Sequence, residues 1–112
     1  MKSLLRNVLL GTLLTTNIYA ACDATGCNEV TIDRLYALDT NDILIETSGI
    51  EANLNCTSFG GASSVITLED SNPSKNIFFS LLLTAQTTNQ KVYIAITPNS
   101  TNCSMAYMYT IK

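Results

Sequence analysis

Short stretches of alternating apolar and polar residues follow one another after the first twenty positions and predict β-strands. Residues 30–38 are rich in β-branched and aromatic side chains, and the polar cluster at 39–42 predicts a turn into a second strand at 43–48. The apolar face of the first segment changes near Asp33 and Arg34, which indicates a bulge. We therefore expect these two segments to form a hairpin.

Four more segments have strand-like composition, at residues 50–57, 65–69, 91–97 and 104–111. In the third of them the apolar residues alternate with other residues, which is typical of a half-buried strand; they are Val92, Ile94 and Ile96. In the last segment the same alternation places four residues on the face shared with Cys103, namely Met105, Tyr107, Tyr109 and Ile111. The chain is therefore expected to end in two strands.

A single helix is predicted between the second and third of these segments. Ser71 or Asn72 suits the N-cap, Pro73 suits the first helical position, and the pattern continues to about Thr88. The apolar side expected to face a sheet consists of Ile77, Phe78, Leu81, Leu82 and Ala85. On the adjoining flank, two more apolar residues are expected either beneath a loop or against another subunit: Phe79 and Leu83.

This order of elements, several strands followed by one helix and two further strands, predicts an α+β domain. The expected architecture is a small, strongly curved antiparallel sheet, or a barrel like the oligonucleotide/oligosaccharide-binding (OB) fold, with one packed helix and stabilising disulfides. No internal repeat, low-complexity tract or block of charge divides the sequence. We expect one domain over residues 21–112.

The first twenty residues have the features of a secretory signal peptide. Lys2 and Arg6 provide a positive start, an apolar run follows, and Ala20 ends a short polar stretch suited to cleavage. The apolar run is shorter than the ~20 residues that cross a bilayer, and no later segment reaches that length. We expect a secreted or periplasmic domain without a membrane span.

Four cysteines remain in that domain and indicate two disulfides, because small exported domains are commonly cross-linked. Three pairings exist; we favour Cys22 with Cys27, and Cys56 with Cys103, since the latter two lie beside strand-like segments far apart in sequence. Lipid attachment at Cys22 is an alternative, because small residues precede it, although it leaves an odd number of thiols. A zinc site is disfavoured because the chain has no histidine.

The charge of the expected domain argues against nucleic acid as a partner. Without residues 1–20, four basic side chains stand against nine carboxylates, a net charge of −5. Phosphate backbones and anionic membrane surfaces select for lysine and arginine, so an acidic chain is repelled by both.

Catalysis also finds little support in the composition. No histidine is available as a general base, the cysteines are expected to be oxidised, and no phosphate-binding glycine loop is present. Paired carboxylates cleave glycosidic bonds in many enzymes, but Asp39 with Asp42, and Glu69 with Asp70, lie in turn-like contexts. We expect a protein that is not an enzyme and needs no cofactor or metal.

A binding role directs attention to tyrosines and small polar groups, because sugar rings stack on aromatic faces while their hydroxyls bind amides and hydroxyls. We expect Tyr36 or Tyr93 to provide the stacking surface, with Ser58 and Ser63 beside it in the glycine-containing segment. Tyr107 and Tyr109 are further candidates, although sharing a face with Cys103 favours a place in the core.

The segments Asn55-Cys56, 76–86 (NIFFSLLLTAQ) and 91–94 (KVYI), with the late Cys103, give the chain a layout that resembles the binding subunits of AB-type bacterial toxins. The subtilase cytotoxin and typhoid toxin binding subunits, and small secreted relatives, are the most similar in layout. This resemblance implies an OB barrel, a five-membered ring, a catalytic partner subunit and recognition of cell-surface glycans.

Two hypotheses follow from these patterns. The first is a secreted, non-catalytic, glycan-binding domain like a toxin binding subunit, with Phe79 and Leu83 at a subunit interface. The second is a small exported structural or interaction protein, such as a periplasmic partner or inhibitor, without a glycan ligand. A stable pentamer favours the first hypothesis, and a monomer with a protein client favours the second.

Overall fold

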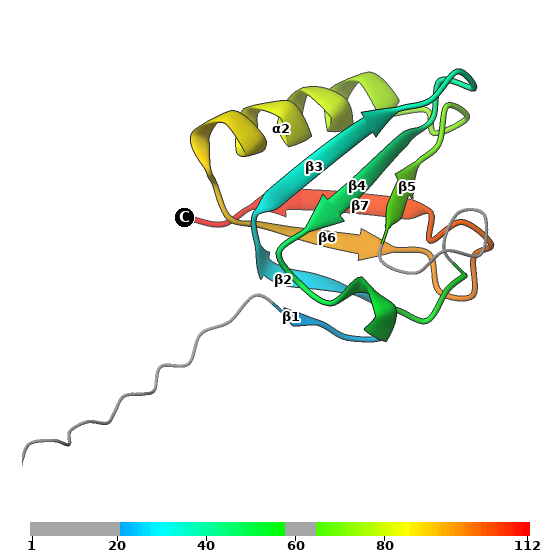
Figure 1. The fold of residues 1–112 in the computed structure, drawn as a ribbon, viewed down its shortest axis with the longest axis horizontal. Coiled ribbons are helices and arrows are strands. Elements are labelled where there is room, and N and C mark those ends of the chain that lie inside the picture. Colours follow the sequence, from blue (N-terminus) through cyan, green and yellow to red (C-terminus); the bar gives the residue numbers. More distant parts are fainter. Residues whose placement is uncertain (1–20, 58–64) are drawn as a thin grey trace, which may run out of the picture.

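Two antiparallel sheets and one α-helix make up the part of the chain that the computed structural model describes, residues 21–57 and 65–112 (Figure 1). One sheet has the order β1-β2-β6-β7, with the strands Ala21–Cys22, Gly26–Val30, Val92–Ile96 and Met105–Thr110. The other has the order β3-β4-β5, with the strands Ile32–Ala37, Ile43–Thr47 and Ile66–Leu68. The α+β class is confirmed, while the predicted signal peptide at 1–20, Ser58 and Ser63 lie outside the described residues.

The two sheets are linked by a strand that bends from one into the other. Only Thr31 separates β2 from β3, so residues 26–37 contribute to both sheets. The predicted hairpin of β3 and β4 is confirmed, and its bulge lies where expected, between the pairs Ile32 with Thr47 and Arg34 with Glu46. On the opposite side, Thr67 of β5 forms an isolated parallel bridge with Ser104. The pairing within the described residues does not close the sheets into a barrel.

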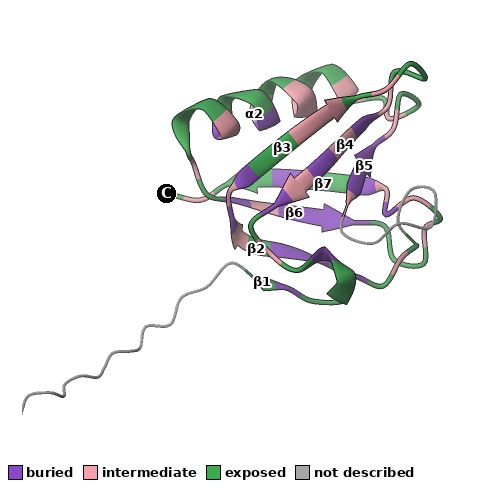
Figure 2. Cartoon of the chain, viewed as in Figure 1, coloured by how far each residue is buried: buried purple, intermediate pink, exposed green. Residues whose placement is uncertain are grey.

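A single hydrophobic core lies between the sheets (Figure 2). Side chains from both sheets and the helix meet in it, and the largest that are fully buried include Ile45, Ile66, Leu68, Leu82 and Ile94. The predicted inward face of β6 is confirmed, because Val92, Ile94 and Ile96 are all buried. The opposite face of this sheet is therefore the one turned away from the core.

Helix α2 (Lys75–Thr88) crosses the top of the domain in Figure 1 and contacts β3, β5 and β7. Leu82 and Ala85 are buried, and Phe78, Phe79 and Leu81 pack partly against the core. The prediction that Ile77 faces the sheet is wrong, since its side chain is 69% exposed. The buried residues follow the spacing of one narrow helical face through positions 78, 82 and 85, and residue 77 lies beyond its edge.

The helix begins two residues later than its sequence signals suggest. Asn72 is not the cap; its side-chain oxygen accepts a hydrogen bond from the N–H group of Ser74 at 2.9 Å and forms a turn before the helix. Ser74 occupies the N-cap position, so Pro73 precedes the helix. The predicted end at Thr88 is confirmed, and Asn89 terminates the helix with a left-handed φ of 56°.

Both favoured disulfides are present, joining Cys22 to Cys27 and Cys56 to Cys103. Because the sulfur of Cys22 is bonded to Cys27, lipid attachment at Cys22 is disfavoured. Within the described ranges, no helix combines the length and apolar character needed to span a membrane.

The strand predicted at residues 50–57 is wrong, because this segment contains a short 3₁₀ helix, η2 (Glu51–Asn53), instead. The carboxylate of Glu51 is buried and accepts hydrogen bonds from both the N–H group and the hydroxyl of Thr47, at 2.5 and 2.6 Å. These bonds fold the chain back on the end of β4, so residue 51 turns inward instead of continuing as a strand.

Two buried threonines differ in whether their hydroxyl group is hydrogen-bonded, and comparing their replacement by valine tests the packing of this structure. Within the described chain, Thr67 Oγ1 is buried without a hydrogen-bond partner, whereas Thr47 Oγ1 donates to Glu51. We expect Thr67→Val to raise the free energy of unfolding by about 1 kcal/mol, because it removes an unsatisfied hydroxyl, and Thr47→Val to lower it by about 2 kcal/mol. Urea denaturation of both variants measures the difference, and a loss of stability in Thr67→Val would contradict this arrangement.

Candidate functional site

Three tyrosines gather on the outer face of the β1-β2-β6-β7 sheet. Tyr93 comes from β6, while Tyr107 and Tyr109 come from β7, where Tyr109 pairs directly with Tyr93 and Tyr107 pairs with Ala95. Since Ile94 and Met108 on the same two strands are buried, the tyrosines occupy the opposite, outward positions. We call Tyr93, Tyr107 and Tyr109 the tyrosine platform.

A bulge in β7 explains why the platform exists. Ile96 pairs with Met105 and Ala95 pairs with Tyr107, so Ala106 is an extra residue that reverses the faces of the strand beyond it. Met105 and Met108 are buried as a result, and Tyr107 and Tyr109 are each 51% exposed. The prediction that Met105 shares its face with both tyrosines is therefore wrong, and these tyrosines are not part of the core.

The rings of the platform form one aromatic surface. The centroids of Tyr93 and Tyr109 are 5.1 Å apart with an angle of 23° between the ring planes, which is a stacked arrangement. Tyr93 and Tyr107 are 6.1 Å apart and tilted by 39°. Both distances lie in the range in which aromatic rings attract each other, so the three rings support one another while two remain half exposed.

The Tyr93 ring is held in place by a glycine on the neighbouring strand. Gly26 of β2 pairs with Ala95, and a Cβ atom at Gly26 would lie only 2.6 Å from the Tyr93 hydroxyl oxygen and 2.6 Å from the Ile94 backbone oxygen. A side chain at Gly26 would displace the ring, because real Cβ atoms do not approach so closely. The glycine thus lets the end of Tyr93 lie against the β2 backbone.

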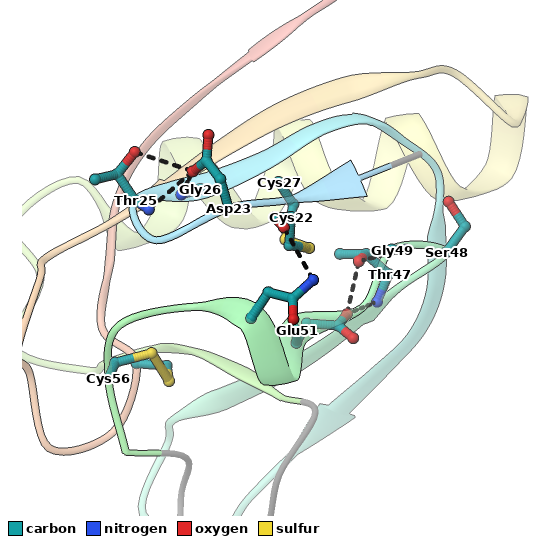
Figure 3. Close-up of a disulfide and its surroundings, with 12 residues drawn as sticks. Cys22, Asp23, Thr25, Gly26, Cys27, Thr47, Ser48, Gly49, Glu51 and Cys56 are labelled. Atoms are coloured by element: carbon teal, nitrogen blue, oxygen red, sulfur yellow. Dashed lines mark hydrogen bonds between the residues drawn. A yellow bond between two sulfur atoms is a disulfide. The ribbon is translucent and has the colours of Figure 1, made fainter. Parts of the chain in front are cut away.

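Figure 3 shows a polar turn at the start of β2, formed by Asp23, Thr25 and Gly26. One oxygen of Asp23, Oδ1, accepts hydrogen bonds from the Thr25 N–H group at 2.9 Å, the Gly26 N–H group at 3.1 Å and the Thr25 hydroxyl at 3.2 Å. Asp23 and Thr25 are both exposed. Because a side chain at Gly26 would collide with the Tyr93 hydroxyl, and because the Gly26 N–H group donates to Asp23, the turn and the platform meet at this residue.

The protonation of these groups follows from their surroundings. The Thr25 N–H group holds the pKa of the Asp23 carboxyl below its ordinary value, with further contributions from the Thr25 hydroxyl and the Gly26 N–H group. Burial raises the pKa of the Tyr93 hydroxyl, and the nearby Tyr107, Asp23 and Tyr109 raise this pKa further. A hydrogen bond with the Thr25 side chain lowers it, but the net shift is upward. At neutral pH the site therefore combines an ionised carboxylate with a protonated phenol.

The other residues proposed from the sequence lie elsewhere. Tyr36 is on β3 in the second sheet, where its hydroxyl donates to Glu46 at 2.9 Å and Arg34 lies over its ring at 5.9 Å. Tyr36 and Tyr93 are thus on different sheets and do not form one surface. On α2, Phe79 packs partly on the core and Leu83 is 43% exposed.

One member of each carboxylate pair considered for catalysis, Asp42 and Asp70, takes part in contacts at the turns of the second sheet. Asp42 accepts hydrogen bonds from the Asp70 N–H group at 2.8 Å and from the Thr40 hydroxyl at 3.1 Å, and Lys75 pairs with Asp70 at 3.2 Å. These bonds join the β3–β4 turn to the start of the helix. Over residues 21–57 and 65–112, no group of three or more His, Cys, Asp and Glu side chains is placed to hold a metal ion.

Sequence reasoning missed the polar border of the platform. The run Asp23-Ala24-Thr25-Gly26 lies between the predicted partners Cys22 and Cys27 and was given no role, yet an aspartate two residues before a threonine and three before a glycine is a typical turn signal. This turn signal would have predicted a turn over residues 23–26 and a strand directly after it, where β2 is found.

Comparison of the chain with known protein families, with curated protein sequences and with solved structures finds no match. The interpretation of the site therefore depends on its own geometry and chemistry.

Proposed function

We propose that this protein is a secreted, non-catalytic binding protein that holds a carbohydrate on the tyrosine platform. The observation that carries the proposal is the gathering of Tyr93, Tyr107 and Tyr109 on one outward sheet face, with two rings half exposed. Aromatic side chains of this size usually bury most of their surface, because it is apolar. A group of three rings, two of them half exposed, is suited to cover the apolar face of a sugar ring.

The border of the platform supplies the polar contacts that a sugar requires. The Tyr93 hydroxyl is protonated and serves as a donor, while the Asp23 carboxylate and the Thr25 hydroxyl serve as acceptors. A few fixed polar groups beside an apolar surface are typical of small-molecule sites, in which stacking gives affinity and hydrogen bonds give orientation. This combination supports a polyhydroxylated ligand over a purely apolar one.

We further propose that the two sheets are an open form of the OB barrel. If β2 and β3 are counted as one bent strand, the strands follow one another in a circle. The order is β3, β4, β5, β7 and β6, and β6 pairs with β2, the other half of the bent strand. The helix stands between β5 and β6 in the chain. The parallel bridge between Thr67 and Ser104 marks the position at which β5 and β7 would close the barrel.

Assembly into a ring, as in toxin binding subunits, belongs to this proposal. Single carbohydrate sites bind weakly, and several sites on one oligomer compensate through simultaneous engagement. Leu83 is available for a contact between subunits, whereas Phe79 already packs partly on the core of its own subunit. Light scattering of the mature protein distinguishes a pentamer from the monomer that the interaction-protein alternative predicts.

A glycan array probed with residues 21–112 tests the proposed function. We expect binding to a limited set of glycans, and we expect it to disappear in the double variant Tyr107→Ala, Tyr109→Ala but to persist in Tyr36→Ala, since only the former changes the platform. Absence of binding to every glycan, or binding that survives loss of both platform tyrosines, would refute the proposal. Either result would favour an exported protein that binds another protein.

A further inference from the structure

The carboxylate at the edge of the tyrosine platform has an unused oxygen. All three hydrogen bonds to the Asp23 side chain reach Oδ1, from the N–H groups of Thr25 and Gly26 and from the Thr25 hydroxyl. Within residues 21–57 and 65–112, no other residue donates a hydrogen bond or forms an ion pair to Oδ2. The turn therefore fixes the direction of the carboxylate through one oxygen and leaves the other open to a ligand.

Aromatic faces and a carboxylate together favour a positive charge. The negative face of a tyrosine ring attracts a cation; the three rings lie together on one surface, and Asp23 is close enough to the Tyr93 hydroxyl to influence its pKa. Lys91, two positions before Tyr93 in the chain, lies 3.9 Å from a carboxylate oxygen of Glu29, which offsets its charge. Residues 21–112 as a whole carry a net charge of −5, so the surrounding field also attracts cations.

We infer that the ligand of the tyrosine platform carries a protonated amine that binds Asp23 Oδ2, and that its chemical class is a sugar with a free amino group. This inference rests on the proposed function, because the platform must first hold the sugar ring. The ring of the aminosugar covers the tyrosine faces while its ammonium group reaches the edge of the platform. Sugars bearing carboxylate or sulfate groups are disfavoured, because Asp23 repels them.

Two disaccharides with the same backbone separate the role of the amine from that of the sugar ring. Deacetylated chitobiose has free amines, whereas N,N′-diacetylchitobiose carries neutral amides at the same positions. At about pH 6 the amines are protonated and the Asp23 carboxylate is ionised. We expect calorimetry to show at least about tenfold tighter binding of the free amine, because a charge-assisted hydrogen bond is roughly twice as strong as a neutral one.

The variant Asp23→Asn removes the charge but keeps a side-chain oxygen for the Thr25 and Gly26 N–H groups, so the turn is expected to persist. It should abolish the preference for the free amine, so that the two disaccharides bind Asp23→Asn with affinities within about twofold of each other. Asp39→Asn is the matched control, because it makes the same change in net charge at an exposed position on another turn.

Each outcome has a distinct meaning. Equal affinity for both disaccharides, or a preference that Asp39→Asn reduces as much as Asp23→Asn, would overturn the inference and leave the proposed function standing. The same holds if neither disaccharide binds while another, amine-free glycan binds the platform. If no glycan binds at all, both the inference and the proposed function fall.

Discussion

Replacing Cys56 and Cys103 together by alanine is expected to lower the free energy of unfolding by about 4 kcal/mol, since their disulfide closes a loop with a sequence separation of 47 residues. This bridge also ties the segment after η2 to the start of β7, next to the bridge between Thr67 and Ser104. Small domains have total stabilities of about 5–15 kcal/mol, so the loss is a large share. Thermal and chemical denaturation of the oxidised protein and the double variant measure it.

The double replacement of Cys22 and Cys27 is the internal control. Their sequence separation is only 5 residues, and the same chain-entropy argument gives about 2 kcal/mol for so short a loop. The order of the two effects is therefore the decisive result. A larger loss from the Cys22 and Cys27 change, or peptide mapping that links Cys56 to a cysteine other than Cys103, would contradict the structure.

Replacing Tyr107 and Tyr109 together by alanine is expected to weaken binding of a platform ligand at least about thirtyfold, because removal of two central aromatic contacts costs about 2 kcal/mol or more. The fold should persist with a loss of about 1–3 kcal/mol, since both side chains are half exposed and lose mainly their aromatic contacts with Tyr93. Calorimetric titration with the glycan selected on the array, together with denaturation of the unliganded variant, measures both quantities.

Two further variants show whether the rings themselves are responsible. Tyr36→Ala removes a tyrosine from the other sheet and should leave affinity unchanged, although it breaks the hydrogen bond to Glu46. Phenylalanine at positions 107 and 109 keeps the aromatic faces and should retain most of the binding. Equal losses in the Tyr36 and platform variants would indicate a general effect on folding rather than loss of a site.

Local patterns were sufficient for much of the fold. The ranges of β4 and β6 were predicted closely, from the turn that precedes β4 and from the alternation of apolar residues in β6, whose Val92, Ile94 and Ile96 are buried. The cysteine pairing followed from the positions of Cys56 and Cys103 beside strand-like segments. The prediction of a strand at 50–57 failed for a reason that no local pattern contains, since the buried carboxylate of Glu51 bonds to Thr47 on the preceding strand.

The candidate site could be predicted only in part. Tyr36 or Tyr93 was expected as the stacking surface because neither shares a face with Cys103, whereas strict alternation favoured a place in the core for Tyr107 and Tyr109. One extra residue, Ala106, reverses that assignment, and the bulge depends on pairing with a strand that precedes β7 in the chain. Asp23 was missed because its role depends on Gly26, whose lack of a side chain matters only once the Tyr93 ring lies against it.

The most direct test of the platform is an NMR titration of residues 21–112 carrying ring-labelled tyrosine. That segment contains only four tyrosines, at positions 36, 93, 107 and 109, so each ring signal can be assigned by single replacement with phenylalanine. With deacetylated chitobiose, or the strongest ligand from the array, we expect the signals of Tyr93, Tyr107 and Tyr109 to shift together along one binding curve while Tyr36 stays unchanged. Shifts at Tyr36 with a silent platform, or no shift at any ring under saturating ligand, would contradict the assignment of the tyrosine platform as the binding site.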